Sequence, residues 1–139
     1  MEIPTTFTNW IHLDALGSLE DLNTPGIYLI GRFESRAPTE IDTNDQRIIY
    51  IGETCSQTLA KRLRQFRRAL LAGRPGHSGG LTLSTQLING SINPKHIFVS
   101  IMSVPHPAPE GPAIIRYIER ALILKFVQTN GTLPVGNSK

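Results

Sequence analysis

Residues 26–33 read GIYLIGRF, and residues 47–52 read RIIYIG. Both stretches are rich in β-branched and aromatic residues and are bounded by glycine, a composition that is typical of β-strands. Residues 34–46, between them, are polar and show no periodicity, which predicts a loop. We therefore expect an antiparallel pair of strands joined by a long connection.

The regions around this pair predict helices and one more strand. Leu59, Leu63, Phe66 and Leu70 recur at helical spacing and predict a helix from about residue 58 to 72, which Gly73 ends. Residues 97–102 predict a third strand, residues 112–128 a helix, and residues 81–88 favour a helix. In residues 1–25, an N-terminal extension, spaced apolar side chains suggest a short helix. The sequence thus predicts a small α+β domain with a three-stranded, mainly antiparallel sheet flanked by helices.

The composition limits the possible classes of protein. A chain of 139 residues and 15.3 kDa is large enough for one core, so we treat residues 1–139 as a single domain. One cysteine excludes an internal disulfide and a cysteine-rich zinc site. No leader-like start and no apolar run of about 20 residues are visible, so we expect a cytoplasmic protein with no membrane partner.

The charge is distributed unevenly along the chain. Residues 1–53 contain nine acidic residues against three arginines, whereas residues 54–139 contain eleven Lys or Arg against two acidic residues. The densest basic run comprises Lys61, Arg62, Arg64, Arg67, Arg68 and Arg74. Such a cluster suits a polyanion such as nucleic acid, since each phosphate contact releases counterions. The alternative is a solvated basic face without a partner.

Several kinds of catalytic site are unsupported. The four histidines lie far apart, and neither a phosphate-binding loop ending in GK[ST] nor a GxSxG elbow occurs. A two-metal nuclease needs several converging carboxylates, but the basic part of the chain offers only Glu110 and Glu119. Phosphodiester chemistry would therefore rest on few acids, on arginine and on tyrosine.

Glu119 falls on an apolar helix face. Ile115, Glu119, Leu122 and Phe126 share one stripe, so the carboxylate must be paired or bound to a cation. Two alternatives remain: an ion pair with a neighbouring arginine, or a metal site. Arg62, at the edge of the apolar stripe on its helix, is placed to hold a phosphate with its planar fork.

The two tyrosine tripeptides resemble the signature of the GIY-YIG endonuclease family. Tyr28 lies in Gly-Ile-Tyr at 26–28, and Tyr50 lies in Tyr-Ile-Gly at 50–52. The family pattern then places an arginine, a glutamate and an asparagine, which match Arg62, Glu119 and Asn137 in that order. The resemblance covers residues 26–137.

The resemblance implies metal-dependent hydrolysis of phosphodiester bonds. One tyrosine activates the attacking water and the other positions it, and we expect Tyr28 to be the base. Arg62 stabilises charge on the phosphate, and Glu119 holds Mg²⁺ or another divalent cation such as Mn²⁺. Asn137 completes the implied catalytic set. DNA is the expected partner, with RNA not excluded, and targeting would need a homodimer or a separate protein.

Some residues depart from the family pattern or add to it. Phe66 stands where many members carry histidine or tyrosine, and Glu53 follows the second tripeptide directly. Besides Lys61, Arg64, Arg67, Arg68 and Arg74, we expect His77 to contact nucleic acid or assist proton transfer, unless its loop is a plain connector. The rival function is a nucleic-acid-binding module of the same fold without cleavage activity.

Overall fold

The computed structural model describes residues 6–19, 22–88 and 92–139. In these ranges it contains strands, α-helices and short 3-10 helices (η). In chain order they are β1 (Ile11–His12), η1 (Leu13–Ser18), β2 (Gly26–Arg32), β3 (Ile48–Thr54), α1 (Leu59–Ala72), α2 (Ser78–Ile88), η2 (Pro94–His96), β4 (Ile97–Ser103) and α3 (Glu110–Asn130).

The sheet of the described residues has four strands in the order β1-β4-β2-β3, and all neighbours are antiparallel. The α+β class with helices flanking an antiparallel sheet is thus confirmed, but the expected count of three strands is wrong. The fourth strand, β1, has two residues, which pair with Phe98 and Val99 of β4. Two residues are too short to show an alternating pattern, so this long-range pairing left no local signal.

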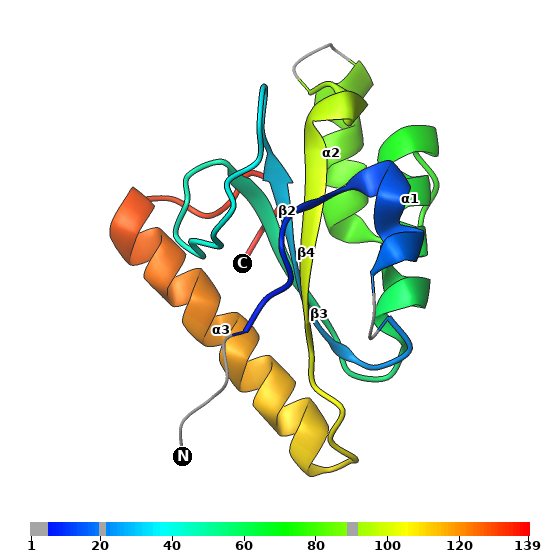
Figure 1. The fold of residues 1–139 in the computed structure, drawn as a ribbon, viewed down its shortest axis with the longest axis vertical. Coiled ribbons are helices and arrows are strands. Elements are labelled where there is room, and N and C mark those ends of the chain that lie inside the picture. Colours follow the sequence, from blue (N-terminus) through cyan, green and yellow to red (C-terminus); the bar gives the residue numbers. More distant parts are fainter. Residues whose placement is uncertain (1–5, 20–21, 89–91) are drawn as a thin grey trace.

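The sheet lies between two helical layers, with α3 on one side and α1 and α2 on the other (Figure 1). β2 is the second strand from one edge and is buried on both faces. Ile27 and Leu29 pack into the core below α3, whereas Tyr28 and Ile30 pack into the core below α1. The tyrosine of the first tripeptide therefore belongs to the α1 side.

Helix α1 forms where its apolar spacing predicts. Thr58 caps its first turn by accepting a hydrogen bond from the backbone of Lys61, and Gly73 ends it with a φ of 64°. Its apolar side chains, including Leu59 and Phe66, are buried against the sheet. Helix α2 begins at Ser78, three residues before the expected start, which places its first turn against α1.

Other segments cover the sheet and its helices. The backbone N–H of Gly136 donates to the carbonyl of Ile49 at 2.7 Å, so residues near the C-terminus run along the outer edge of β3. The 34–46 connection packs towards α3, where Asn130 Nδ2 donates to the carbonyl of Asn44 at 2.9 Å. Within the described ranges, no helix is both long enough and apolar enough to cross a bilayer.

Candidate active site at the edge of strand β3

The two signature tyrosines stack on the α1 side of the sheet. Tyr28 is paired with Gly52 and Ile30 with Tyr50, so both phenol rings project from the same face. The rings lie nearly parallel, with centroids 5.9 Å apart and an interplanar angle of 16°. Gly52 makes this possible, because a Cβ at that position would lie 2.4 Å from Cζ of Tyr28.

The two tyrosines differ in their access to solvent. Tyr28 is fully enclosed, with 0% of its surface exposed, whereas Tyr50 is only partly buried. Burial, reinforced by Tyr50, raises the pKa of Tyr28 well above its ordinary value, and Arg62 opposes the rise. Burial also raises the pKa of Tyr50, and the positive charge of Arg62 again lowers it in part.

Arg62 leans from α1 over the loop that joins α1 to α2. Its Nη1 donates to Oε1 of Gln65 and to the carbonyl of Gly76, both at 2.9 Å. The guanidinium also lines a polar hollow together with Glu53 and Arg116. It therefore supplies positive charge beside the tyrosines while it tethers the loop that follows α1.

Glu119 is half-buried on the sheet-facing stripe of α3, with 19% of its side chain exposed. Burial, followed by repulsion from Glu53, raises the pKa of Glu119, and Arg120 opposes this. Among the described residues, Arg120 is its sole ion-pair partner, at 4.0 Å, the outer limit for such a pair. Arg120 therefore compensates the carboxylate poorly, which favours the cation-binding alternative over the ion pair.

Tyr50 and Glu119 meet at one hollow although they come from opposite sides of the sheet. β3 is an edge strand, so residues on its two faces can converge around its outer side. The hollow is lined by these two residues and by others that include Ser78, Arg120 and Asn137.

Asn137 occupies the rim of this hollow through contacts with the backbone. Its Nδ2 donates to the carbonyl of Ile51, and its Oδ1 accepts from the N–H of the same residue, both at 2.9 Å. The amide thus pairs with β3 as a neighbouring strand would, satisfying groups that an edge strand leaves open. In this structure Asn137 positions the C-terminal segment next to Glu119.

The donor set of the site fits a single-carboxylate magnesium site. No group of three or more His, Cys, Asp or Glu converges on one point in the described ranges. Mg²⁺ commonly binds through one or two carboxylates and keeps several waters, so such a cluster is not required. The partly desolvated carboxylate of Glu119, close enough to Glu53 for repulsion, would gain stability from a bound cation.

Glu53 and Cys55 form a contact that sequence reasoning missed. The Cys55 thiol donates to Oε2 of Glu53 at 2.9 Å, which turns this carboxylate towards residue 55. Burial and the adjacent Glu53 raise the pKa of Cys55 to about 12, so its thiol stays protonated and is not a nucleophile.

His77 does not lie at the molecular surface, where the expected contact with nucleic acid would need it. It is buried, with 2% of its surface exposed, and its Nε2 lies 2.6 Å from the hydroxyl of Tyr28. The following glycines allow this position: a Cβ on Gly79 would lie 2.1 Å from Cε1 of Tyr50, and one on Gly80 would lie 2.7 Å from Cβ of Ala69. In the sequence, the run His-Ser-Gly-Gly at 77–80 is the feature that could have indicated this close packing.

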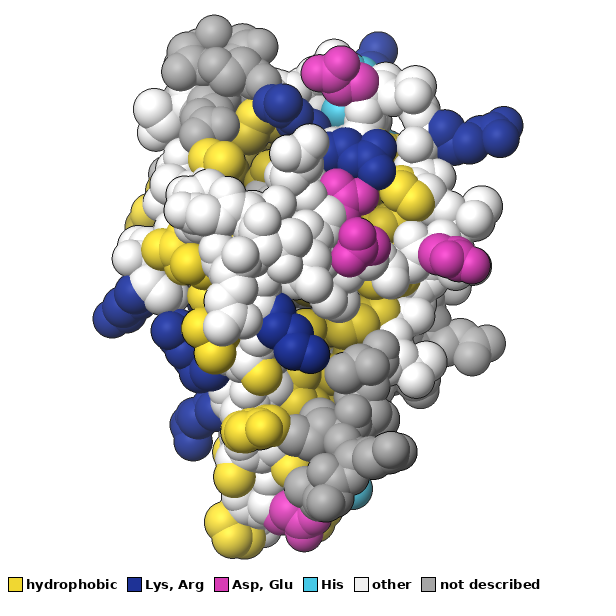
Figure 2. All heavy atoms as spheres, turned by 90° about the vertical axis from the view of Figure 1, so that its left-hand side faces the viewer, with side chains coloured by type: hydrophobic (Ala, Val, Ile, Leu, Met, Phe, Trp, Pro, Cys, Tyr) yellow, Lys and Arg dark blue, Asp and Glu magenta, His cyan; other side chains and the backbone are white. Residues whose placement is uncertain are grey.

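The remaining basic residues of the cluster lie on the surface. Exposed side chains of α1 and of the turn after it are Lys61, Arg64, Arg67, Arg68 and Arg74. Arg67 is partly neutralised, because its Nη2 donates to Oδ1 of Asp14 at 3.0 Å. On the opposite, α3 side of the molecule, basic side chains are interspersed with acidic and apolar ones (Figure 2).

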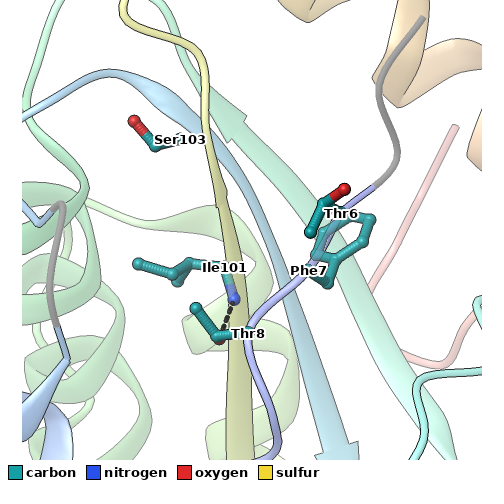
Figure 3. A pocket seen from close by; sticks show the side chains of 5 residues that line it. All are labelled: Thr6, Phe7, Thr8, Ile101 and Ser103. Atoms are coloured by element: carbon teal, nitrogen blue, oxygen red, sulfur yellow. Dashed lines mark hydrogen bonds between the residues drawn. The ribbon is translucent and has the colours of Figure 1, made fainter.

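A different hollow lies beside β4, which is separated from β3 by β2 in the sheet order. Its lining comprises Thr6, Phe7, Thr8, Ile101 and Ser103 (Figure 3). Thr8 Oγ1 accepts from the backbone N–H of Ile101 at 3.0 Å, which fixes the N-terminal segment against the strand. None of the five lining side chains is charged, so the groups suited to catalysis are those around β3.

No protein-family model, curated protein or solved structure matches this chain.

Proposed function

We propose that this chain is a metal-dependent endonuclease of the GIY-YIG type that hydrolyses DNA phosphodiester bonds. The observation that carries the proposal is the convergence of Tyr50 and Glu119 on one hollow at the edge of β3. Tyr28 and Arg62 lie close enough to Tyr50 to influence its pKa. A purely structural role does not account for a poorly compensated carboxylate next to stacked tyrosines.

In the proposed reaction, water attacks phosphorus in line with the departing oxygen. One tyrosine of the pair, as the phenolate after its own proton has passed to solvent, takes a proton from this water, and the planar fork of Arg62 neutralises charge that develops on the phosphate. A divalent cation at Glu119, Mg²⁺ or Mn²⁺, supplies further stabilisation of that charge when it is bound. The phosphorus–oxygen bond to the leaving nucleoside breaks, and the departing oxygen acquires a proton from solvent.

Helix α1 supplies affinity in this proposal. Its exposed Lys61, Arg64 and Arg68 project away from the sheet, where they can contact successive phosphates without reading bases. The proposal therefore predicts binding that depends strongly on salt and weakly on sequence.

The direct test is incubation of the purified chain with supercoiled plasmid, with Mg²⁺ and with a chelator. We expect the wild type to give nicked or linear plasmid in the presence of Mg²⁺ and no product in the presence of the chelator. Glu119→Gln should give no product in either condition. Glu110→Gln is the matched control, because Glu110 lies exposed on the first turn of the same helix.

Binding of the plasmid by the wild type without cleavage in Mg²⁺ or Mn²⁺ would contradict the proposal and support the rival, a binding module without activity. A parallel incubation with duplex and single-stranded RNA distinguishes the substrates. Cleavage of RNA alone would overturn the assignment of DNA.

A further inference from the structure

Helix α3 carries two exposed arginines, Arg116 and Arg120, on the flank that adjoins Glu119. They are four residues apart, so they lie one above the other, separated by roughly 6 Å along the helix axis. At about 100° per residue, Arg116 lies about 60° and Arg120 about 100° around the helix from Glu119, in the same direction. The two guanidinium groups are therefore neighbours of the Glu119 carboxylate and do not lie on the far side of the helix.

Arg116 lines the polar hollow to which Arg62 also belongs. The wall of this hollow joins α1, α3 and the segment that follows β3, and every lining residue has a polar or charged side chain. The charged ones are Glu53, Arg62 and Arg116. Its volume of about 260 Å³ exceeds that of a phosphate group.

This hollow has an excess of positive charge, since two guanidinium groups accompany one carboxylate. Within the described ranges, neither Arg62 nor Arg116 forms an ion pair with an acidic residue. The carboxylate of Glu53 instead accepts a hydrogen bond from the Cys55 thiol. An anion in the hollow would therefore meet two cations that no acidic side chain has neutralised by direct contact.

Arg120 lines the neighbouring hollow, which contains Tyr50 and Glu119. Its Nη1 lies 4.0 Å from Oε1 of Glu119 and donates to the carbonyl of Lys139 at 3.2 Å. A guanidinium has five N–H donors, so these contacts leave donors for a ligand. Consecutive turns of α3 thus supply one arginine to each of the two hollows.

Arginines in a row along one helix flank suit a chain of phosphates better than a single small anion. Each planar guanidinium can hold two oxygens of one phosphate. Arg62 is common to the polar hollow and to the proposed reaction. A phosphate in that hollow would therefore belong to a nucleotide next to the scissile bond.

We propose that the flank of α3 formed by Arg116 and Arg120 binds the sugar–phosphate backbone of the strand that is cut, with Arg116 holding a phosphate next to the scissile one. This inference rests on the proposed nuclease function and gives the substrate a path across α3, in addition to its contacts with α1. Arg116 is a positioning residue, because it contacts a phosphate that does not react. Holding that phosphate fixes the scissile one beside Tyr50 and Glu119.

The first measurement is binding of a labelled DNA duplex by fluorescence anisotropy, with a chelator present and at several salt concentrations. We expect Arg116→Ala to lose about tenfold in affinity and to lower the salt slope by about 0.9, as for one phosphate contact. Lys125→Ala is the matched control, because Lys125 is exposed on the opposite flank of the same helix, and it should bind as the wild type does. Equal losses in the two variants would show only a general effect of positive charge and would overturn the inference.

The second measurement reads occupancy of the polar hollow from Cys55, which lines it and is the single cysteine of the chain. Alkylation of the wild type by iodoacetamide is followed by mass spectrometry, with and without the DNA duplex. At a DNA concentration of about ten times Kd, we expect alkylation to be about tenfold slower, by mass action. An unchanged rate would mean that DNA binds outside this hollow.

The third measurement is single-turnover cleavage of a duplex whose cut position has been mapped. A neutral methylphosphonate replaces, one at a time, the phosphates on either side of the scissile one. At one of these positions it should slow the wild type about tenfold and have little further effect on Arg116→Ala, as for two partners in one contact. Independent, additive losses at both positions would show that Arg116 does not hold a neighbouring phosphate.

The outcomes separate this inference from the proposed function. A wild type that binds DNA without cutting it, and that gives the expected results for affinity and alkylation, would support the α3 surface and overturn the nuclease function alone. Normal affinity and normal cleavage by Arg116→Ala would overturn the α3 surface and leave the nuclease function intact.

Discussion

The carboxylate of Glu119 lies on a helix stripe where an apolar side chain would stabilise the fold more. Its neighbours on that stripe, Ile115 and Leu122, are buried in the core. Burial and Glu53 both oppose its ionisation, and Arg120 at 4.0 Å compensates only weakly. A group whose charge is disfavoured in the folded state lowers stability at neutral pH, and a bound cation would reverse this effect.

Glu119→Gln should therefore stabilise the free protein. We expect its Tm at pH 7 to rise by roughly 2–4 °C, the shift that about 1 kcal/mol produces in a domain of this size. Mg²⁺ should raise the Tm of the wild type and leave that of the variant unchanged. Differential scanning calorimetry with and without Mg²⁺ tests both statements. A lower Tm in the variant, with no effect of Mg²⁺ on the wild type, would show that Glu119 is a structural ion-pair residue.

The lowered pKa of His77 predicts that acid destabilises the fold. The ordinary pKa of histidine is 6.5 and that of folded His77, which is buried and lies near the positive charge of Arg62, is about 4. Between these pH values the unfolded chain therefore binds a proton that the folded chain does not bind. Stability contributed by the neutral ring is present above pH 6.5 and is lost as the pH falls from there towards 4.

We expect this loss to reach roughly 2 kcal/mol by pH 4.5, and to be absent in His77→Phe. Urea unfolding of both proteins at pH 7 and pH 4.5 gives the difference directly. The same decrease in both proteins would mean that other groups cause it and that His77 titrates normally when folded.

The individual site residues were predictable to different degrees. Local patterns predicted which strand or helix carries Tyr28, Tyr50 and Glu119, because the period of each of these elements shows in the sequence. The role of His77 depends on how the loop after α1 closes over the sheet, which no local pattern encodes. The pairing of the Asn137 amide with the backbone of Ile51 likewise depends on the path of the C-terminal segment, which no local pattern encodes.

Helix α1 has two faces with different roles, one in folding and one in binding. Leu59, Leu63 and Phe66 are buried against the sheet, whereas Arg64 and Arg68 are exposed on the outer face. Changes on the outer face should therefore affect binding without affecting folding.

The double variant Arg64→Glu with Arg68→Glu should weaken binding to every DNA sequence alike and flatten its salt dependence. Fluorescence anisotropy titrations at several salt concentrations measure both. The matched control reverses Arg36 and Lys125, two exposed charges elsewhere on the molecule. Unchanged affinity in the α1 variant, with a normal melting curve, would show that the basic face is only solvated.

The start of α2 is built around the ring of Tyr50. A Cβ on Gly79 would lie 2.1 Å from Cε1 of that ring, whereas Gly17 has open space around it. We expect Gly79→Ala to displace the ring and reduce single-turnover cleavage by tenfold or more while DNA affinity is retained. Gly17→Ala should cleave normally. Wild-type cleavage by Gly79→Ala would mean that the position of the Tyr50 ring does not matter for the reaction.

At the scale of the whole molecule, the site depends on the sheet order. Because β3 is an edge strand, groups from α2 and α3 can meet around its outer side. The long strands and helices were predictable from their periods, and the antiparallel pairing of β2 with β3 from their adjacency. Strand β1 and the path of residues 136–137 along β3 were not predictable, because both depend on backbone pairing between segments that are far apart in the sequence.

If Arg62 and its neighbours perform chemistry rather than only bind a polyanion, Arg62→Ala gives the most direct test. Single-turnover cleavage of a labelled duplex is measured beside a binding titration of the same DNA, with Arg74→Ala as the exposed control. We predict a rate loss of about 10²–10³-fold with a much smaller loss of affinity, and the control near wild type in rate. Equal losses of rate and affinity in Arg62→Ala would contradict a catalytic role and make Arg62 an ordinary binding contact.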